Sequence, residues 1–310
     1  MKTLKIFQIL SLIIATVLCS CSNDENLGQD TEDKVYTVSL KFNGEITSSD
    51  SPLTRGTATD DLYGVLVWQD GKSYASGLYD NIEDIKINLK ASSKYKFVVT
   101  AVKNGKSIIY RPFDTFYDQP FNLHCQNGLS SGFPNYGYDN FKGGTSQVSN
   151  ASALYYPEAD RFYGEIDNYT PTENGVINMD LKRTAFGLQY QVSGVTDGTL
   201  SVTIKNTKQT FFSKTDINSD YTSEEKIITF YDVYSAWQYA DSYTENVTVS
   251  ASWRRGFGIT QDLGSKQVVV KRNKMNIIHI KLSTDESGNN IGINVESDSD
   301  MNDESVNIPL

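Results

Sequence analysis

The residue best placed for chemistry is Cys21, which closes a short apolar run near the N-terminus. Residues 6–18 are mostly apolar and follow two lysines, and their length fits the central region of a signal peptide better than the ~20 residues of a spanning helix. Leu18 lies three positions before the cysteine and the small Ser20 directly before it, an arrangement that a bacterial lipoprotein signal peptidase accepts. The sequence therefore predicts that residues 1–20 are removed and that the thiol of Cys21 carries lipid.

The predicted lipid would anchor the protein in a membrane. Acyl chains contribute about 0.8 kcal/mol per buried methylene, so several chains together hold a protein stably. Residues 21–34 are polar and acidic, and we expect them to form a flexible linker because they have too few apolar side chains to pack. This stretch resembles the acidic segment behind the lipidated cysteine in surface lipoproteins of Bacteroidetes. The resemblance implies a lipid-anchored protein exposed on the cell outer membrane. An ordinary secretory signal that is cut near this point is the alternative.

Other residues that could support catalysis are few. The chain has two histidines, His124 and His279, too few for a histidine-based metal cluster. His124 precedes Cys125, but adjacent residues of an extended chain point to opposite faces and do not form a nucleophile with its base. We therefore expect no enzyme, no cofactor and no metal centre. Residues 216–220 and 298–304 alternate oxygen-bearing side chains, but they lack the glycine and glutamate of a calcium-binding loop, which favours solvated acidic clusters.

The net charge bears on the class of partner, and the cysteine content bears on what stabilises the fold. The formal net charge is −10, and nucleic acid, which requires clustered basic side chains, is therefore not expected as a partner. After removal of the leader and lipidation of Cys21, Cys125 alone would remain. A single thiol cannot form an internal disulfide, so the hydrophobic core must hold the fold together.

Aromatic residues gather in one polar segment of the chain. Residues 133–141 contain Tyr136, Tyr138 and Phe141 among Gly, Asn and Asp. Aromatic rings on such a loop could stack on sugars or dock a protein, because they offer contact area together with polar groups. They could equally pack the loop back onto the body of the protein. The pattern favours packing and leaves a ligand loop as the second interpretation.

The elements that must position these residues have the signature of β-strands. Apolar and polar side chains alternate in segment after segment, which is typical of antiparallel sheets with one face on a core. The segments with this alternation are 36–42, 85–89, 95–101, 177–181, 186–192, 200–204, 247–253 and 278–282. Helical periodicity is limited to a short candidate at residues 234–240. The sequence therefore predicts an all-β fold, built as antiparallel β-sandwiches of transthyretin-like or Greek-key type.

The alternation stops between residues 112 and 160, where Gly, Asn, Ser and Tyr dominate. A long segment of this kind is either functional or a connection between domains. We therefore predict two sandwich domains, residues 35–165 and residues 166–285, of a size that suits seven or so strands each. Residues 286–310 follow as an acidic C-terminal tail or as a strand donated to another chain.

Two segments of the second half carry a resemblance to a known family. Residues 181–186 read Leu-Lys-Arg-Thr-Ala-Phe, and residues 268–275 read Val-Val-Val-Lys-Arg-Asn-Lys-Met. Both are similar to segments of the fimbrillin families of Bacteroidetes, which are subunits and accessory proteins of type V pili. The resemblance implies other fimbrial subunits as partners. It does not separate a stalk subunit from a tip or anchor protein.

The resemblance gives Arg55 and Gly56 a role. In type V pilins a trypsin-like protease cuts after a basic residue in the loop that follows the first strand, and a strand of the next subunit fills the groove. Residues 36–42 form a suitable first strand here, and residues 48–57 read as an exposed loop of the kind that proteases cut. The resemblance therefore implies cleavage between Arg55 and Gly56. A solvated loop arginine is the alternative, because anchor proteins of the family are not cut in this way.

The C-terminus offers two candidate donor strands, residues 291–295 and residues 306–310, with apolar side chains at alternate positions. In a polymer one of them would insert into a neighbour, and otherwise they pair within their own domain or remain a solvated tail. The sequence thus predicts a fimbrial subunit or accessory adhesin that binds partner subunits by strand addition, with a host protein or glycan as a further partner. The alternative is a carbohydrate-binding surface lipoprotein of a glycan-uptake system.

Overall fold

The computed structural model describes most of the chain between residues 34 and 300. The described residues are 34–48, 60–105, 128–131, 145–146, 154–155, 158–208, 210–255, 258, 260–285 and 288–300. Nearly every element within these ranges is a β-strand, which confirms the all-β prediction. None of the helices in the described ranges is long and apolar enough to cross a membrane.

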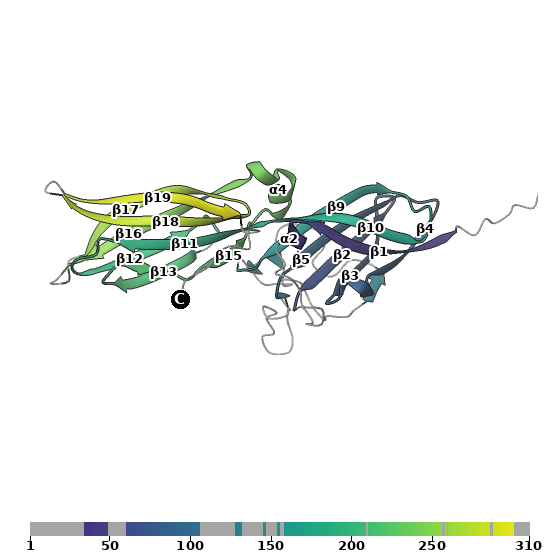
Figure 1. Cartoon of the computed structure of the whole chain (residues 1–310), viewed down its shortest axis with the longest axis horizontal. Coiled ribbons are helices and arrows are strands. Elements are labelled where there is room, and N and C mark those ends of the chain that lie inside the picture. Colours follow the sequence, from purple (N-terminus) through teal and green to yellow (C-terminus); the bar gives the residue numbers. More distant parts are fainter. Residues whose placement is uncertain are drawn as a thin grey trace, which may run out of the picture.

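The first half of the described chain forms one folded sheet around one core, here called the N-terminal sandwich (Figure 1). Its elements are β1 (Val35–Gly44), α2 (Glu45–Ser48), β2 (Leu62–Gln69), β3 (Lys72–Tyr79), η1 (Ile82–Asp84), β4 (Lys86–Lys90), β5 (Tyr95–Val102), β6 (Gly128–Ser131), β9 (Arg161–Tyr169) and β10 (Gly175–Arg183). The strands pair in the order β4-β1-β10-β9-β5-β2-β3-β6. Two further short strands, β7 (Thr145–Ser146) and β8 (Leu154–Tyr155), pair with each other.

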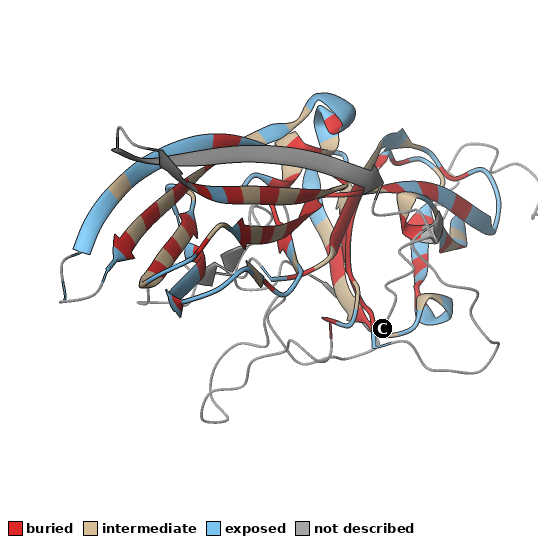
Figure 2. Cartoon of the chain, turned by 60° about the vertical axis from the view of Figure 1, so that its left-hand side comes forward, coloured by how far each residue is buried: buried red, intermediate tan, exposed pale blue. Residues whose placement is uncertain are grey.

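The sheet folds over itself at β10. This strand pairs with β1 along residues 175–181 but with β9 only at Lys182 and Arg183. Buried side chains of β4, β1 and β10 therefore face those of β9, β5 and β2 across a shared core. Figure 2 shows the alternation of buried and exposed residues along the strands that the sequence pattern predicted.

The second half forms two facing sheets around a second core, here called the C-terminal sandwich (Figure 1). Its elements are β11 (Ala185–Ser193), β12 (Thr199–Lys205), β13 (Thr210–Ile217), β14 (Tyr221–Thr222), β15 (Lys226–Thr229), α4 (Val233–Gln238), η4 (Ala240–Ser242), β16 (Thr244–Arg254), β17 (Thr260–Lys271), β18 (Lys274–Asp285) and β19 (Gly288–Asp300). One sheet has the order β14-β11-β18-β19, with β15 also paired to β11, and the other has the order β13-β12-β16-β17. The short helix expected at residues 234–240 is confirmed by α4.

The two sandwiches repeat one arrangement of strands. The order β3-β2-β5-β9 in the N-terminal sandwich corresponds to β13-β12-β16-β17 in the C-terminal one. The order β4-β1-β10 corresponds to β15-β11-β18 in the same way. The C-terminal sandwich then adds β19, which pairs with β18 on the side away from β11. Among the described residues no strand occupies the corresponding place beside residues 175–181 of β10.

One pair in each sandwich departs from the predicted antiparallel sheets. β1 runs parallel to β10, and β11 runs parallel to β18. The remaining strand pairs are antiparallel. In each sandwich the parallel partners are the first strand and a late one. Between them the chain passes to the strands on the other side of the core and then returns. Alternation along one strand carries no information on the direction of its neighbour, so the pattern could not reveal these two pairs.

The predicted boundary between residues 165 and 166 falls inside β9, and the predicted second domain would have contained β10. Both strands belong to the sheet of the N-terminal sandwich. The chain passes into the next sheet only at Thr184, between the end of β10 and the start of β11. Residues 112–160 misled the prediction because they lie in sequence between β5 and β9, two neighbours of one sheet, and do not link two domains.

The predicted tail at residues 286–310 is in part a strand of its own sandwich. Residues 288–300 form β19 and pair antiparallel with β18 from Lys274 to Asp285. The first candidate donor strand, residues 291–295, is therefore seated within its own chain here. The second, residues 306–310, lies outside the described residues.

The two sandwiches contact each other through α4. Val233 of this helix is fully buried in a small apolar cluster with Leu62, Leu66 and Tyr163 of the N-terminal sheet. Tyr163 and Trp237 meet edge to face, with ring centroids 5.6 Å apart. The outer face of the N-terminal sheet is thus covered at one end by the C-terminal half of the chain.

Candidate functional site

The strand that best fits a functional role is β1, because it is the first strand and lies inside a sheet. It pairs in parallel with β10 from Val38 to Gly44 and antiparallel with β4 from Val35 to Ser39. Its absence would therefore expose unpaired backbone groups on two neighbouring strands at once. An open strand position of this kind is a template for pairing with another chain.

Core side chains also hold β1 in place. Val38, Leu40 and Phe42 point inward and are at most 6% exposed. The Phe42 ring packs against Tyr63 of β2 with 5.6 Å between the ring centroids. Burying side chains of this size contributes about 1.5–3 kcal/mol each relative to leaving them exposed. The strand thus combines two backbone ladders with three side chains that fill the core.

Gly44 ends the strand and turns the chain. Its φ is +82°, a conformation that residues with a side chain rarely adopt. A Cβ atom at this position would lie 2.9 Å from the carbonyl oxygen of Leu181 in β10. The turn at Gly44 leads directly into α2, so that Glu45 leaves the plane of the sheet and reaches the junction of the two sandwiches.

Glu45 binds two separate strand ends at this junction. Its carboxylate accepts hydrogen bonds from both terminal nitrogens of Arg272, at 2.7 and 2.9 Å. One of its oxygens also accepts from the backbone N–H of Arg183 at 2.6 Å. Bidentate pairs between a guanidinium and a carboxylate are the strong and geometrically specific class of charged hydrogen bond. The segment after β1 is therefore fastened to the turn between β17 and β18.

Arg272 is held by backbone groups as well as by Glu45. Its side chain is 3% exposed. The guanidinium donates to the carbonyl oxygens of Ala240 at 2.9 Å and Arg183 at 2.7 Å. It also pairs at 3.1 Å with Asp241, whose side chain is 98% exposed. Since solvent screens an exposed carboxylate, Glu45 is the principal countercharge of this buried arginine.

Arg183 completes the junction from the end of β10. Its guanidinium makes a two-point contact with Asp160, at 2.8 and 3.0 Å, and donates to the side-chain oxygen of Asn273 at 2.9 Å. It also lies 4.9 Å from the ring centroid of Phe162. We call Glu45, Arg183, Arg272, Asp160 and Asn273 the clasp. They come from α2, the end of β10, the turn between β17 and β18, and the segment before β9.

The clasp unites the two motifs that carried the family resemblance. Arg183 lies in residues 181–186, while Arg272 and Asn273 lie in residues 268–275. Sequence reasoning missed Glu45 and Asp160 altogether and gave the two arginines no structural role. The sequence did contain a signal, because each arginine lies directly at the end of an alternating apolar strand pattern. An arginine in such a place is a candidate for burial, and a buried arginine requires a carboxylate partner.

Most of the site residues predicted from the sequence lie outside the described residues. These are Cys21, Arg55, Gly56, Tyr136, Tyr138 and Phe141. His279 is described and is half-buried between the buried Ile278 and Ile280, on the outer face of β18 as expected. Asp220, from one of the two acidic segments, accepts a hydrogen bond from the backbone N–H of Gly194 at 2.9 Å. Within the described part of the chain, no cluster of three or more His, Cys, Asp or Glu side chains could hold a metal.

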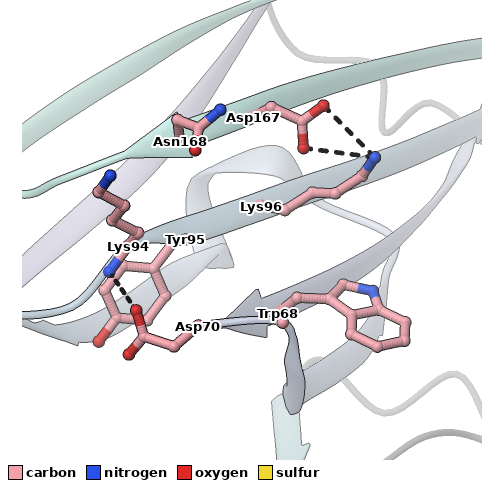
Figure 3. A pocket seen from close by; sticks show the side chains of 8 residues that line it. Trp68, Asp70, Lys94, Tyr95, Lys96, Asp167 and Asn168 are labelled. Carbon is pink, nitrogen blue, oxygen red and sulfur yellow. Dashed lines mark hydrogen bonds and ion pairs between the residues drawn. The ribbon is translucent and has the colours of Figure 1, made fainter.

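A shallow pocket lies at the other end of the N-terminal sandwich, between the β2–β3 turn, β5 and the end of β9 (Figure 3). Its volume is about 360 Å³. Trp68, Tyr95, Lys94 and Asn168 are among the lining residues, and Lys96 forms an ion pair with Asp167. The pocket combines aromatic rings with hydrogen-bonding groups. It is remote from the clasp, since β1 ends at one end of the sandwich and the β2–β3 turn lies at the other.

Comparison with known proteins gives structural likeness only. No protein-family model and no curated protein sequence matches the chain. The chain is similar to the tip fimbrial protein Mfa3 of Porphyromonas gingivalis, with 10% identity, a TM-score of 0.37, and coverage of 85% of this chain and 100% of that one. It is similar to the fimbrial anchor protein Mfa2 of the same organism, with 8% identity, a TM-score of 0.37, and coverage of 85% and 98%.

A third similar structure is a fimbrial assembly protein of Parabacteroides distasonis, with 13% identity and a TM-score of 0.33. It is covered over 98% of its length by 86% of this chain. These three solved structures are a tip fimbrial protein, a fimbrial anchor protein and a fimbrial assembly protein.

Proposed function

We propose that this chain is a non-catalytic fimbrial subunit or accessory adhesin whose N-terminal sandwich binds a partner subunit by replacement of β1. The position of β1 carries the proposal, because this first strand lies between β4 and β10 and supplies core side chains. A strand of another chain in this place would gain two backbone ladders and a set of core contacts. Addition at an outer edge of the sheet would gain one ladder.

Replacement requires that β1 be separated from the rest of the chain. Residues 49–59 connect α2 to β2 and contain the predicted cleavage site between Arg55 and Gly56. We propose that a trypsin-like protease cuts there. The fragment that ends at Arg55 would then be held by its two ladders, its core side chains and the clasp, and a competing strand could displace it.

The proposed lipid on Cys21 gives this cut a consequence for localisation. Cys21 precedes β1, so both lie on the same side of Arg55. We propose that the uncut chain is anchored in the cell outer membrane and exposed at its surface. The cut chain would stay attached only for as long as β1 remains seated. We further propose that the two sandwiches are the two domains, with their boundary at Thr184.

Limited proteolysis tests the proposed function. The purified chain is incubated with an Arg-specific protease, the new N-termini are sequenced, and the products are followed on a native gel. We expect a new N-terminus at Gly56 and a ladder of assemblies, both absent from an Arg55→Gln variant. Formation of the new N-terminus without assembly, or survival of the intact chain, would contradict the proposal.

A carbohydrate-binding surface lipoprotein is the second candidate, and the pocket beside Trp68 and Tyr95 favours it. The partly exposed Trp68 ring, flanked by amide and charged groups, suits the apolar face and hydroxyls of a sugar, whereas Tyr95 is buried beneath the pocket. Retention of the wild-type chain on polysaccharide columns, lost in a Trp68→Ala variant, would support this function. Failure of the wild-type chain to bind any of a panel of polysaccharides would exclude it.

A further inference from the structure

The clasp makes β1 chemically distinct from an ordinary apolar strand. Arg272 and Arg183 have side chains that are 3% and 4% exposed. Asp160 neutralises Arg183, whereas the well-shielded countercharge of Arg272 is Glu45, and Glu45 belongs to the segment that would leave with β1. Removal of β1 would thus open an apolar groove that ends at an arginine whose remaining countercharge is the exposed Asp241.

Several groups at this end of the groove point at the position of Glu45. Both terminal nitrogens of Arg272 and the backbone N–H of Arg183 donate to its carboxylate. After loss of Glu45, Arg272 would retain two backbone carbonyls and the exposed carboxylate of Asp241. A buried charge left without its countercharge is strongly unfavourable, which gives an incoming carboxylate an advantage over a neutral group.

We propose that the groove selects a partner strand that carries an acidic residue three positions after its third core side chain, read by Arg272 and the backbone of Arg183. The inference rests on the proposed function. In β1 the three core positions are Val38, Leu40 and Phe42, and the acid is Glu45. The apolar positions fix the register against β10, and the acid distinguishes this strand from other alternating strands.

The spacing of core residues and acid is set by the turn at Gly44. The backbone bends there at φ +82°, and a Cβ added at Gly44 would lie 2.9 Å from the Leu181 carbonyl oxygen. A strand that continued straight would carry its next side chains past the clasp. A partner strand with glycine at this position can follow the same path and place its carboxylate against the Arg272 guanidinium and the backbone N–H of Arg183.

Three other segments of the chain have the required spacing, namely residues 63–70, 278–285 and 291–298. The first two belong to β2 and β18, which lie inside their own sheets, whereas the third belongs to β19 at the end of its sheet order. Ile291, Ile293 and Val295 occupy the core positions of the pattern, and Asp298 follows three residues after the last of them. Ser297 stands where β1 has Gly44, so we expect this segment to fit less well than β1 itself. A second copy of the chain and a different fimbrial subunit are therefore two sources of the same chemistry, and separate peptides distinguish them.

The test uses the full chain from residue 22 with residues 51–57 replaced by the site of a sequence-specific protease. After cleavage, mild denaturant releases the β1 fragment, and fluorescent peptides are added as the denaturant is diluted. The peptides are residues 35–48, the same peptide with Glu45→Gln, a control with Lys41→Gln on its exposed face, and residues 288–300. Fluorescence anisotropy gives the dissociation constant of each.

We expect the Glu45→Gln peptide to bind at least about tenfold more weakly than the wild-type peptide, which corresponds to about 1.4 kcal/mol. The Lys41→Gln peptide should bind within about twofold of the wild type, because Lys41 is exposed. In a cut chain that also carries Arg272→Gln, the preference for the acid should disappear, which assigns it to this arginine. Binding of the residue 288–300 peptide would support a second copy as the source of the strand.

Two outcomes separate the inference from the function on which it rests. Equal binding of the wild-type and Glu45→Gln peptides would overturn the selection of an acid but leave strand replacement intact. Failure of every peptide to bind a cut chain that has lost its own fragment would overturn strand replacement, and the inference with it.

Discussion

The strands β1 and β11 occupy equivalent places in two sandwiches of the same design. Each is the first strand of its unit. Each runs parallel to a late strand, β10 or β18, and antiparallel to a strand from the middle of the unit, β4 or β15. Gly44 is the last residue of β1 and Gly194 directly follows β11, and both have a φ of +82°. A Cβ at either would meet a carbonyl oxygen of the parallel partner strand, that of Leu181 or Leu282. The two strands thus share their pairing pattern and the position of the glycine at which each of them ends.

The residues that follow the two glycines differ. After Gly44, the carboxylate of Glu45 enters the clasp at the buried junction between the sandwiches. After Gly194 no such acid follows, and the Gly194 N–H donates to Asp220, which is exposed. Pairing and packing are therefore common to both first strands, whereas a buried ionic fastening is peculiar to β1. This difference agrees with the proposal that β1, and not β11, is replaced by a strand of another chain.

The two sandwiches also differ in the strand beside their late strands, β10 and β18. β18 carries β19 on its outer side, while among the described residues β10 carries no strand in the corresponding place. Among the described strands, β19 lies at the edge of its sheet with one ladder partner, whereas β1 has two. An edge strand with one neighbour is easier to release than an interior strand. The position of β19 therefore suits a strand that is donated to another subunit, and the position of β1 suits a strand that a donated strand replaces.

Removal of the buried cation should produce the largest loss of stability. Arg272→Gln breaks the bidentate pair with Glu45 and the bonds to two carbonyls, and we expect a cost of about 3–5 kcal/mol in unfolding free energy. Urea denaturation measures it. The corresponding change at the end of β11, Asp220→Asn, should cost less than about 1 kcal/mol, because that carboxylate is exposed. Equal costs would remove the distinction between β1 and β11.

Core truncation should affect the two first strands alike. Leu40→Ala in β1 and Leu188→Ala in β11 each delete a buried side chain, and each should cost about 2–5 kcal/mol. Hydrogen exchange followed for each sandwich separately shows where the loss falls. We expect Leu40→Ala to raise exchange in β4 and β10 and Leu188→Ala to raise it in β15 and β18. A neutral Leu40→Ala would mean that β1 does not contribute to the core as described.

The two turns should tolerate no side chain. Gly44→Ala and Gly194→Ala each impose a strained φ and a close contact, at 2.9 and 2.5 Å from a carbonyl oxygen. We expect costs of about 1–3 kcal/mol, with Gly194→Ala the larger. Thermal unfolding measures them. The control is Gly175→Ala in β10, where φ is not positive and nothing lies within 4 Å of the added Cβ, and this change should be close to neutral.

The smallest effect concerns a carboxylate that is hydrogen-bonded to an amide rather than to an arginine. Burial raises the pKa of Glu245 above its usual 4.5, and the hydrogen bond from Asn206 only partly opposes this. A raised pKa in the folded state stabilises the fold below pH 4.5, and that contribution is lost as the pH rises through the folded-state pKa. Glu245→Gln should therefore gain stability relative to the wild type between about pH 4 and pH 7. If the unfolding free energies of the variant and the wild type changed with pH in parallel, this expectation would be contradicted.

Much of the fold follows from the sequence because alternation reports directly on burial. The first strand was predicted at residues 36–42 and is observed at Val35–Gly44, and α4 lies where the one helical candidate was placed. β10 was also found as a strand but was assigned to the wrong half. Periodicity tells which side chains face a core, but it does not tell which of two cores they face.

The clasp could not be predicted because it depends on contacts between residues that are far apart in the sequence. Glu45 and Arg272 are 227 residues apart, and they meet only when both sandwiches and α4 are in place. Local pattern showed Arg183 and Arg272 as motif residues without showing that either is buried. The remaining predictions, on Cys21, Arg55 and the loop around Tyr138, stay predictions, because these residues lie outside the described part of the chain.

Hydrogen exchange on the cut chain tests most directly whether β1 is a replaceable strand in a sandwich that otherwise stays folded. The cut chain is measured by mass spectrometry with its own fragment, after release of the fragment, and after addition of the residue 35–48 peptide. We predict that amides of β4 and β10 lose protection on release and regain it with the peptide, while β12 and β16 stay protected throughout. Loss of protection across the N-terminal sandwich that the peptide does not restore, or no change in β4 and β10, would contradict the account.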